Sequence, residues 1–392
     1  MAHGTRGEGG REMTAVAVDS VADLRDHVLD AAKRGAPLRI AGRGTWLDAG
    51  RPVRATETLS TRELSGITEY VPGDLTLTAR AGTTLGEIRD ATSKHGQWLA
   101  LDPAGSNDGT LGATIATASS GPLRSLFGAP RDLTLGVEFV TGAGVVARGG
   151  GRVVKNVAGF DLTRLLTGSW GTLGVITEVT VRLHARPEAD ESIAVAIDAK
   201  TGVSRVRQLL RRLPFAPYAC EVVNAELAPV VGARDTTALF RLGGNSESVR
   251  AQRGALAELG DPREVDGDVW RRLAMAEPDH AMVFRLSALP TAIESVWSQA
   301  ISVAATCPGT LIHATAARGV VRCIVPRSDA SVNALQRQFV DSTDVRRIGE
   351  RLPAELWAAC APPPTADRLS AGIKRTFDPK HLLNIGILGE PA

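Results

Sequence analysis

Three glycine-rich stretches decide the fold of this chain: Ala41-Gly-Arg-Gly-Thr45, Gly105-Ser-Asn-Asp-Gly-Thr-Leu-Gly-Ala113 and Gly168-Ser-Trp-Gly-Thr-Leu-Gly174. Of the 41 glycines in 392 residues, 23 lie between residues 42 and 174, and 13 follow residue 186. Glycine permits positive φ and a close approach of the backbone to a ligand or to another segment. Each stretch by itself is equally consistent with an ordinary turn. Together they predict one extended, phosphate-bearing ligand along the backbone, because successive N–H groups in such loops bind anions.

The region that holds these stretches has the pattern of alternating helices and strands. Ser20 and Asp23 form a capping box that opens a helix, and Gly35 is placed to end it. A strand over residues 38–41 then runs directly into the first glycine-rich stretch. The same reasoning predicts strands within 66–81, a helix over 85–94, a hairpin over 133–147 and a strand over 172–184.

One further glycine motif imitates a dinucleotide fingerprint. Gly142-Ala-Gly-Val-Val-Ala147 fits the G-x-G-x-x-A pattern and follows a predicted strand. That fingerprint requires a helix to start at the glycines, so that its N-terminus faces a pyrophosphate. Here a second strand follows, so we interpret the motif as a hairpin turn. The sequence also contains no G-x-x-x-x-G-K-[ST] phosphate-binding loop.

The residues after Pro187 have a different pattern of predicted elements, which forms two successive strand–helix–strand–strand–helix units. Such units predict a paired ferredoxin-like sheet with its helices on one face. A proline run at 362–364 then resembles a semi-rigid linker before a last helix over 366–376. The predicted strands of the two units are 192–197, 219–223, 238–242, 282–287, 310–315 and 320–325, and the predicted helices are 203–213, 246–259, 290–305 and 331–340.

The composition excludes several classes of protein. Lys and Arg number 45 against 43 Asp and Glu, so a net charge of +2 offers no basic surface for nucleic acid. The four cysteines are widely spaced without a CxxC pair, which excludes a zinc ribbon and an iron–sulfur ligand run and favours the reducing cytosol. Residues 1–14 are glycine-rich and charged, so we expect a disordered lead-in, with Met13 as an alternative start, and no signal peptide. No apolar run approaches the roughly 20 residues that span a membrane.

Several motifs, taken as a set, resemble the FAD-binding domain of the vanillyl-alcohol oxidase/p-cresol methylhydroxylase (PCMH) family. The resemblance runs from about Leu38 to Leu183, and its Val154-to-Leu162 string is similar to the smaller flavin-binding subunit of bacterial glycolate oxidase. The ending Phe377-Asp-Pro-Lys-His-Leu-Leu-Asn-Ile-Gly386 resembles the closing F-D-P…N-P-G of the family, with Ile385 in place of proline. The other matching strings are 72–82, 105–116, Arg131-Asp132 and 171–176.

This resemblance implies an α+β fold with a two-subdomain PCMH-type FAD-binding domain and a ferredoxin-like-derived cap. We expect the lead-in at 1–14, the FAD-binding domain at 15–186 and the cap at 187–345. The segment 346–392 is expected to return to the FAD domain.

The resemblance also implies which residues bind FAD. The first loop, Gly42, Arg43, Gly44 and Thr45, corresponds to the pyrophosphate loop of the family. Many members attach FAD through a histidine in this loop, and its absence here implies noncovalent FAD. The remaining residues implied as FAD ligands are Gly105, Asp108, Gly109, Thr110, Gly112, Ala113, Asn156, Gly159, Asp161, Gly171, Gly174, Val175 and Ile176.

The activity implied by the resemblance is oxidation of glycolate or a similar 2-hydroxy acid within a multi-subunit complex. That reaction needs a cation for the carboxylate and a base for the hydroxyl proton. Arg285, His313, Arg318 and His381 are candidates, at no diagnostic spacing, and His313 in an apolar strand is equally readable as a structural residue. Closely spaced histidines that bind metal in related dehydrogenases are missing, so we predict no metal site.

The resemblance further implies partners: a larger FAD-binding catalytic subunit and an iron–sulfur subunit. An alternative therefore stays open, in which this chain is a non-catalytic electron-relay or structural subunit. Either interpretation places the protein in the cytoplasm, with the inner face of the membrane reached through its partners.

Overall fold

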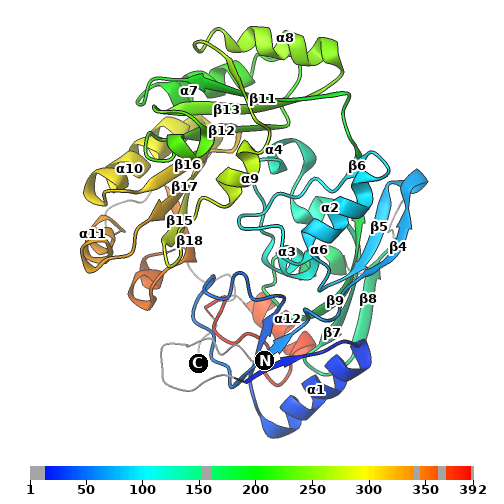
Figure 1. Ribbon diagram of the computed structural model, residues 1–392. Helices are drawn as coiled ribbons and strands as arrows, with labels where there is room; N and C mark the ends of the chain where they lie inside the picture. Colours follow the sequence, from blue (N-terminus) through cyan, green and yellow to red (C-terminus); the bar gives the residue numbers. More distant parts are fainter. Residues whose placement is uncertain (1–13, 152–160, 340–344, 361–367, 390–392) are drawn as a thin grey trace.

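The computed structural model describes residues 14–151, 161–339, 345–360 and 368–389. Two lobes are visible in Figure 1, one built on the smaller sheets and one on a single large sheet. The content is mixed α and β, as predicted. Asn156 and Gly159, and the proline run at 362–364, lie outside the described residues.

The first sheet is parallel, with the order β1-β3-β2, and is covered by one helix. Its strands are β1 (Thr14–Ala17), β2 (Leu38–Ala41) and β3 (Glu57–Ser60), and its helix is α1 (Val21–Arg34). The Ser20 side chain accepts the Asp23 N–H, and Gly35 ends the helix at φ 62°, as the sequence predicted. Leu24 and Val28 of α1 pack with Leu38 and Leu59 in a common core. This packing fixes the strand end from which the first glycine loop departs.

The second sheet is antiparallel, with the order β4-β5-β9-β7-β8. Its helices α2, α3 and α6 contribute Ile88, Ile115 and Leu166 to the core beneath it. The strands are β4 (Ile67–Val71), β5 (Thr76–Arg80), β7 (Thr134–Thr141), β8 (Val146–Gly150) and β9 (Gly174–Arg182), and the helices are α2 (Leu85–Ser93), α3 (Leu111–Thr117), α4 (Arg124–Phe127), α5 (Pro130–Leu133) and α6 (Leu162–Leu166). The 3-10 turn η1 (Pro72–Asp74) and the two-stranded pair β6 (Gln97–Trp98) with β10 (His184–Ala185) complete this lobe.

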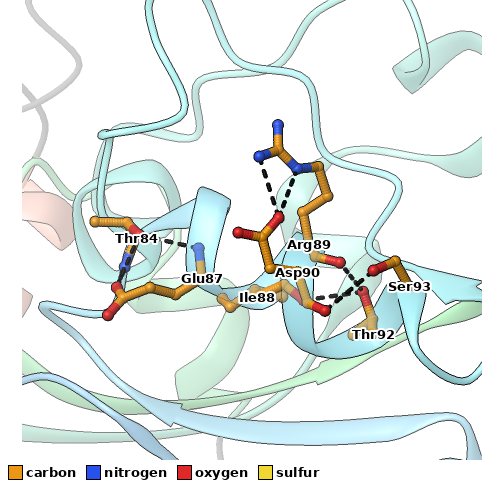
Figure 2. A network of polar contacts seen from close by, with 7 residues as sticks. All are labelled: Thr84, Glu87, Ile88, Arg89, Asp90, Thr92 and Ser93. Atoms are coloured by element: carbon orange, nitrogen blue, oxygen red, sulfur yellow. Dashed lines mark hydrogen bonds and ion pairs between the residues drawn. The ribbon is translucent and has the colours of Figure 1, made fainter.

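Local side-chain chemistry sets the start of α2 (Figure 2). Thr84 Oγ1 accepts the Glu87 N–H at 3.1 Å, and the Glu87 carboxylate accepts the Thr84 N–H at 2.7 Å. This reciprocal capping box satisfies two donors that the first helical turn would leave unpaired. The Gly142–Gly144 motif is a hairpin turn between β7 and β8, as predicted, because the Gly144 N–H donates to the Thr141 carbonyl.

The third sheet has eight strands in the order β14-β11-β13-β12-β16-β17-β15-β18. The helices α7, α8, α10 and α11 pack on one face, as predicted, whereas α9 and η2 pack on the other. The strands are β11 (Ala189–Ala196), β12 (Ala219–Val223), β13 (Thr237–Gly244), β14 (Arg263–Val265), β15 (Met282–Ser287), β16 (Leu311–Thr315), β17 (Val320–Val325) and β18 (Arg346–Arg351). The helices are α7 (Gly202–Leu210), η2 (Ala228–Val231), α8 (Ser246–Leu256), α9 (Val269–Ala274), η3 (Pro290–Ala292), α10 (Ile293–Thr306), η4 (Ala316–Arg318), α11 (Asp329–Phe339) and η5 (Ala354–Ala359).

Strand β18 lies past the expected boundary after residue 345 and belongs to the large sheet. Strand β18 pairs along its length with β15, and Leu352 and Trp357 of the following turn join the core of the sheet. Because β18 is hydrogen-bonded to the cap, we propose that the returning segment begins only after η5.

The end of the chain returns to the first lobe, as the fold class implied. After α12 (Arg368–Phe377), the Leu38 N–H donates to the Leu382 carbonyl and the Asn384 N–H donates to the Leu38 carbonyl. The Lys374 ammonium is buried and pairs with the fully buried Asp378 carboxylate at 2.8 Å. The tail therefore forms part of the scaffold behind the glycine-rich loops.

Candidate functional site

A narrow cavity of about 100 Å³ lies between the glycine-rich loops and the returning tail. Its walls come from the end of β2, from α3, from the start of β9 and from Asn384 and Ile387. The predicted residues that the fold brings together here are Gly42, Arg43, Gly44, Thr45, Gly112, Ala113, Gly171, Gly174, Val175 and Ile176. Segments separated by more than 300 residues in sequence thus line one groove.

The glycines of this groove are required by packing. A Cβ on Gly42 would lie 2.3 Å from Thr110 Oγ1, and a Cβ on Gly112 would lie 2.6 Å from the Ala81 Cβ and 3.0 Å from its backbone. A Cβ on Gly174 would lie 2.6 Å from the Phe139 ring. Any side chain at these positions would push apart the walls that the groove depends on.

The first loop also has the donors that a pyrophosphate needs. Among the described residues, no hydrogen-bond acceptor is present for the backbone N–H groups of Arg43, Gly44 and Thr45. Arg43 is among the residues that line the groove, and its guanidinium has no acidic partner in the described part of the chain. Unpaired N–H groups in consecutive residues and a nearby cation suit a phosphate diester. The groove therefore fits the pyrophosphate of a dinucleotide.

Other residues implied as ligands lie outside this groove. The Gly105 N–H donates to the Ala274 carbonyl of α9, and Asp108 accepts from Ser106. The Gly109 carbonyl accepts the Leu85 N–H, and Asp161 accepts the Arg164 N–H as the N-cap of α6. Thr110 caps α3 by accepting the Ala113 N–H. These bonds fold the loops and cap the helices, and contact of these residues with FAD stays a prediction.

A larger cavity of about 330 Å³ adjoins the groove and extends to the face of the large sheet. The two spaces share Trp46, Thr117, Trp170 and Ile387 in their linings, and the Trp46 and Trp170 rings stack 6.2 Å apart. A long ligand in the groove can therefore reach the larger cavity. The volume falls within the range of small-molecule sites, about 300–1,000 Å³.

Successive side chains of a strand point to opposite faces of the sheet, which determines the side chains that face this cavity. Ile312 and Ala314 of β16 face the helices, so His313 and Thr315 face the other way. His313 lies opposite Arg322 of β17 in the register. Arg322 in turn lies opposite Arg285 of β15, which gives a polar row across three strands.

A buried glutamate holds His313. The His313 Nδ1 lies 2.7 Å from Glu221 Oε2, and the Thr315 hydroxyl donates to Glu221 Oε1 at 2.5 Å. Glu221 is 0% exposed, whereas His313 is 15% exposed and lines the cavity. Because Nδ1 faces Glu221, the Nε2 atom is the nitrogen left for a ligand. This is the geometry of a histidine base oriented by a carboxylate.

The arginines of the row are held by acidic groups. Arg285 and Arg322 both pair with Glu350, each at 2.6 Å, and Arg322 also pairs with Glu277. Although burial raises the pKa of Glu350, the charges of Arg322 and Arg285 hold it below its ordinary value. The Glu350 backbone carbonyl accepts the Gly50 N–H, which ties the row to the first lobe.

The wall on the side of the first lobe carries Asp102 and Arg124. Asp102 accepts the Gly121 and Leu123 N–H groups at 3.0 and 2.9 Å, and burial raises its pKa to about 7. Burial, and then the charges of Arg318 and Arg285, lower the pKa of Arg124. Groups with shifted pKa values gather at functional sites more often than elsewhere.

Three of the four predicted catalytic candidates meet in this cavity. Arg285, His313 and Arg318 all line it, whereas His381 lines neither space and is exposed on the tail. Sequence reasoning missed Glu221, Asp102 and Arg124. A glutamate within the apolar run Cys220–Val223 was a signal for the first, because a charge there is costly without a partner. Within the described residues, no group of three or more His, Cys, Asp or Glu side chains is placed to hold a metal ion.

Comparison with known proteins gives this geometry its context. A family described as FAD binding domain matches residues 14–150. The glycolate oxidase subunit GlcE of Escherichia coli is 37% identical over 252 residues, which cover 64% of this chain and 67% of that protein. The chain belongs to the PCMH-type FAD-binding flavoproteins.

A second curated relative matches a shorter part of this chain. The glycolate oxidase subunit GlcD of Bacillus subtilis is 39% identical over 160 residues, which cover 40% of this chain and 34% of that protein. Among solved structures, p-cresol methylhydroxylase with substrate bound superposes with a TM-score of 0.75 at 16% identity, over 96% of this chain and 88% of that one. The latter likeness shows the fold alone. FAD is thus the cofactor of this flavoprotein, and two relatives from Mycobacterium tuberculosis, each 31% identical over 164 residues, are named FAD-linked oxidoreductases.

Proposed function

We propose that this flavoprotein is the FAD-binding subunit of a complex that oxidises a glycolate-like 2-hydroxy acid, and that it has an active site of its own. The observation that carries the proposal is the position of His313 and three arginines in a cavity that adjoins the cofactor groove. The names of the relatives GlcE and GlcD support the substrate class.

The reaction removes the hydroxyl proton and the Cα hydride of the acid, which yields the 2-oxo acid. Bound FAD supplies the acceptor for the hydride and its two electrons. His313 Nε2 accepts the hydroxyl proton, and Glu221 orients the ring and stabilises the imidazolium that forms. Arg124 supplies the cation for the carboxylate beside the reacting carbon. Trp270 and Leu273 of α9 also line the cavity and limit the access of water.

FAD is proposed to be held without a covalent bond. The groove is lined by Gly42, Arg43, Gly44 and Thr45 where many members of the family attach the cofactor to a histidine. We place the pyrophosphate at this loop and the adenosine end near Gly171–Ile176.

Electrons then have to leave the chain for a partner. Cys220, Cys307 and Cys323 are buried and Cys360 is partly buried, so the described cysteines offer no cluster of iron–sulfur ligands. We therefore propose a larger flavin subunit and an iron–sulfur subunit as partners. The described residues contain no helix that is long and apolar enough to cross a membrane. The complex is proposed to be cytoplasmic, with any contact to the inner face of the membrane made by its partners.

The test is anaerobic reduction of the flavin in the purified chain, followed by its absorbance after glycolate is added. The expected result is bleaching on the timescale of turnover, slowed by about 10²–10⁴-fold in His313→Asn. His381→Asn is the matched control, because this exposed histidine lies outside both spaces, and it should behave as the wild type. Bleaching that requires the partner subunits would instead support the electron-relay or structural alternative.

A further inference from the structure

Some of the arginines around the larger cavity are paired with carboxylates, and others have no acidic partner among the described residues. Arg322 pairs with Glu277 and Glu350, and Arg285 shares Glu350. Arg351 pairs with Asp48 at 2.7 Å and with Glu277 at 3.5 Å. These three guanidiniums and three carboxylates form one continuous network of zero net charge. The network needs no ligand to balance it.

Three further arginines line the same cavity, and one of them, Arg51, is engaged by Trp357, because its guanidinium lies 5.2 Å from the centre of that ring. Arg124 and Arg318 have no ion pair within the described residues. The Arg124 Nε is buried and has no hydrogen-bond partner there. Asp132, the acid whose charge acts on Arg124, is already paired with Arg131 and caps α5. The charge of Arg318 acts on Arg124, and two like charges in one lining favour a ligand with negative charge.

The other acidic groups of the lining, Glu221 and Asp102, form no ion pair with Arg124 or Arg318 among the described residues. Both carboxylate oxygens of Glu221 are engaged by His313 and Thr315, and this carboxylate balances the imidazolium that proton transfer creates. Asp102 is partly buried and accepts two backbone N–H groups, and burial raises its pKa to about 7, so its negative charge near neutral pH is only partial. Arg124 and Arg318 thus present two cationic groups to a ligand, whereas glycolate carries one carboxylate.

We infer that the cavity accepts a 2-hydroxy acid with a second acid group, and that Arg318 binds that second group. This inference rests on the proposed function. Arg124 is partly buried on the wall of the first lobe and suits the carboxylate beside the reacting carbon. Arg318 is exposed yet lines the cavity, so it lies at the rim, five residues after His313 on the same segment. A diacid would extend from the base to this rim.

The test compares two acids of four carbons that differ in one charge, 2-hydroxybutyrate and malate. Flavin reduction is measured under anaerobic conditions for the wild type, for Arg318→Gln and for Arg250→Gln. Arg250 is the matched control, an exposed arginine on α8, which covers the opposite face of the sheet. The expected result is a preference for malate in the wild type. Arg318→Gln should lower kcat/KM for malate by about 10- to 100-fold and change that for 2-hydroxybutyrate by less than about threefold. Arg250→Gln should change neither.

A binding measurement separates this inference from the proposed function. Succinate and butyrate cannot be oxidised in this way, so the shift they cause in the flavin absorbance spectrum reports binding alone. Tighter binding of succinate that disappears in Arg318→Gln supports the inference even if no hydroxy acid is oxidised, which would defeat only the proposed function. Equal use and equal binding of monoacid and diacid would overturn the inference. A uniform loss in Arg318→Gln, or a changed midpoint potential of its flavin without substrate, would also overturn it, because Arg318 would then act on the cofactor or on every acid alike.

Discussion

The side chain of Asn384 joins the returning tail to both walls of the cofactor groove. Its Oδ1 accepts the Ile40 N–H at 2.8 Å, just before the first glycine loop, and its Nδ2 donates to the Trp170 carbonyl at 2.7 Å. Asn384 is 3% exposed and has a φ of 47°, in the left-handed region that asparagine tolerates. Asn384→Ala therefore removes both side-chain hydrogen bonds. It also places alanine, which disfavours positive φ, in the left-handed conformation.

The magnitude follows from these three losses. Each backbone group left unpaired at a partly buried position costs about 1–2 kcal/mol. Alanine in the left-handed region costs about 1 kcal/mol more than asparagine or glycine. We expect Asn384→Ala to lower the free energy of unfolding by about 3–5 kcal/mol, and Asn384→Gly by about 1 kcal/mol less. Because both walls of the groove loosen, the Kd for FAD should rise by at least about tenfold.

The assay combines urea unfolding of the FAD-free chain with a titration of FAD followed by flavin fluorescence. Asn245→Ala is the control, because Asn245 caps α8 by accepting the Ser248 N–H, far from the groove. That variant should lose about 1 kcal/mol and bind FAD as the wild type does. The reasoning is refuted if Asn384→Ala unfolds at the urea concentration of the wild type and keeps its FAD affinity. It is also refuted if the glycine variant is less stable than the alanine variant.

Three further changes test the rest of the structure. Glu221→Gln should slow flavin reduction by about 10²–10⁴-fold, because glutamine fails to fix the tautomer of His313. Rapid-mixing absorbance measures the rate of flavin reduction, and a wild-type rate in this variant would contradict the role of Glu221. Gly112→Ala should lower the free energy of unfolding by about 1–3 kcal/mol, because the new Cβ would meet Ala81. Gly254→Ala, where a Cβ on α8 meets no atom, should raise it by about 0.5–1 kcal/mol. Equal midpoints of urea unfolding for the two variants would contradict this packing. Asp102 has a folded pKa of about 7, above its ordinary 3.8, so the folded state binds the extra proton between these values and loses stability as pH rises from about 4 to 7. Asp102→Asn should reduce this dependence of the free energy of unfolding on pH. An unchanged dependence would show that it comes from other groups.

The sequence predicted most of the scaffold because its signals are local. The capping residue Ser20, the helix stop at Gly35 and the hairpin at Gly142–Gly144 act within a few residues, and the structure has each where it was expected. Strand β18 was missed, because its pattern of partly buried residues lacks the alternation that marks a strand with one buried face.

The groove was partly predictable for the same reason. Glycines at 42, 112 and 174 stand out in the composition, and the fold brings them into one lining. Gly105 and Gly109 stand out equally yet line neither space. A glycine indicates that the backbone is closely packed or has positive φ at that position. It does not indicate whether a ligand or another segment of the chain lies against it.

The larger cavity was decided by the tertiary structure. His313 and Glu221 are 92 residues apart, and they meet only because β12 and β16 are neighbours in the sheet. Arg124 comes from the other lobe and reaches the cavity only through the packing of α4 against β12. Local chemistry thus determined from sequence alone that the chain binds a cofactor and where its loops turn. The pairing of distant strands decided which charges face the substrate, because strand order depends on contacts between segments that no local pattern encodes.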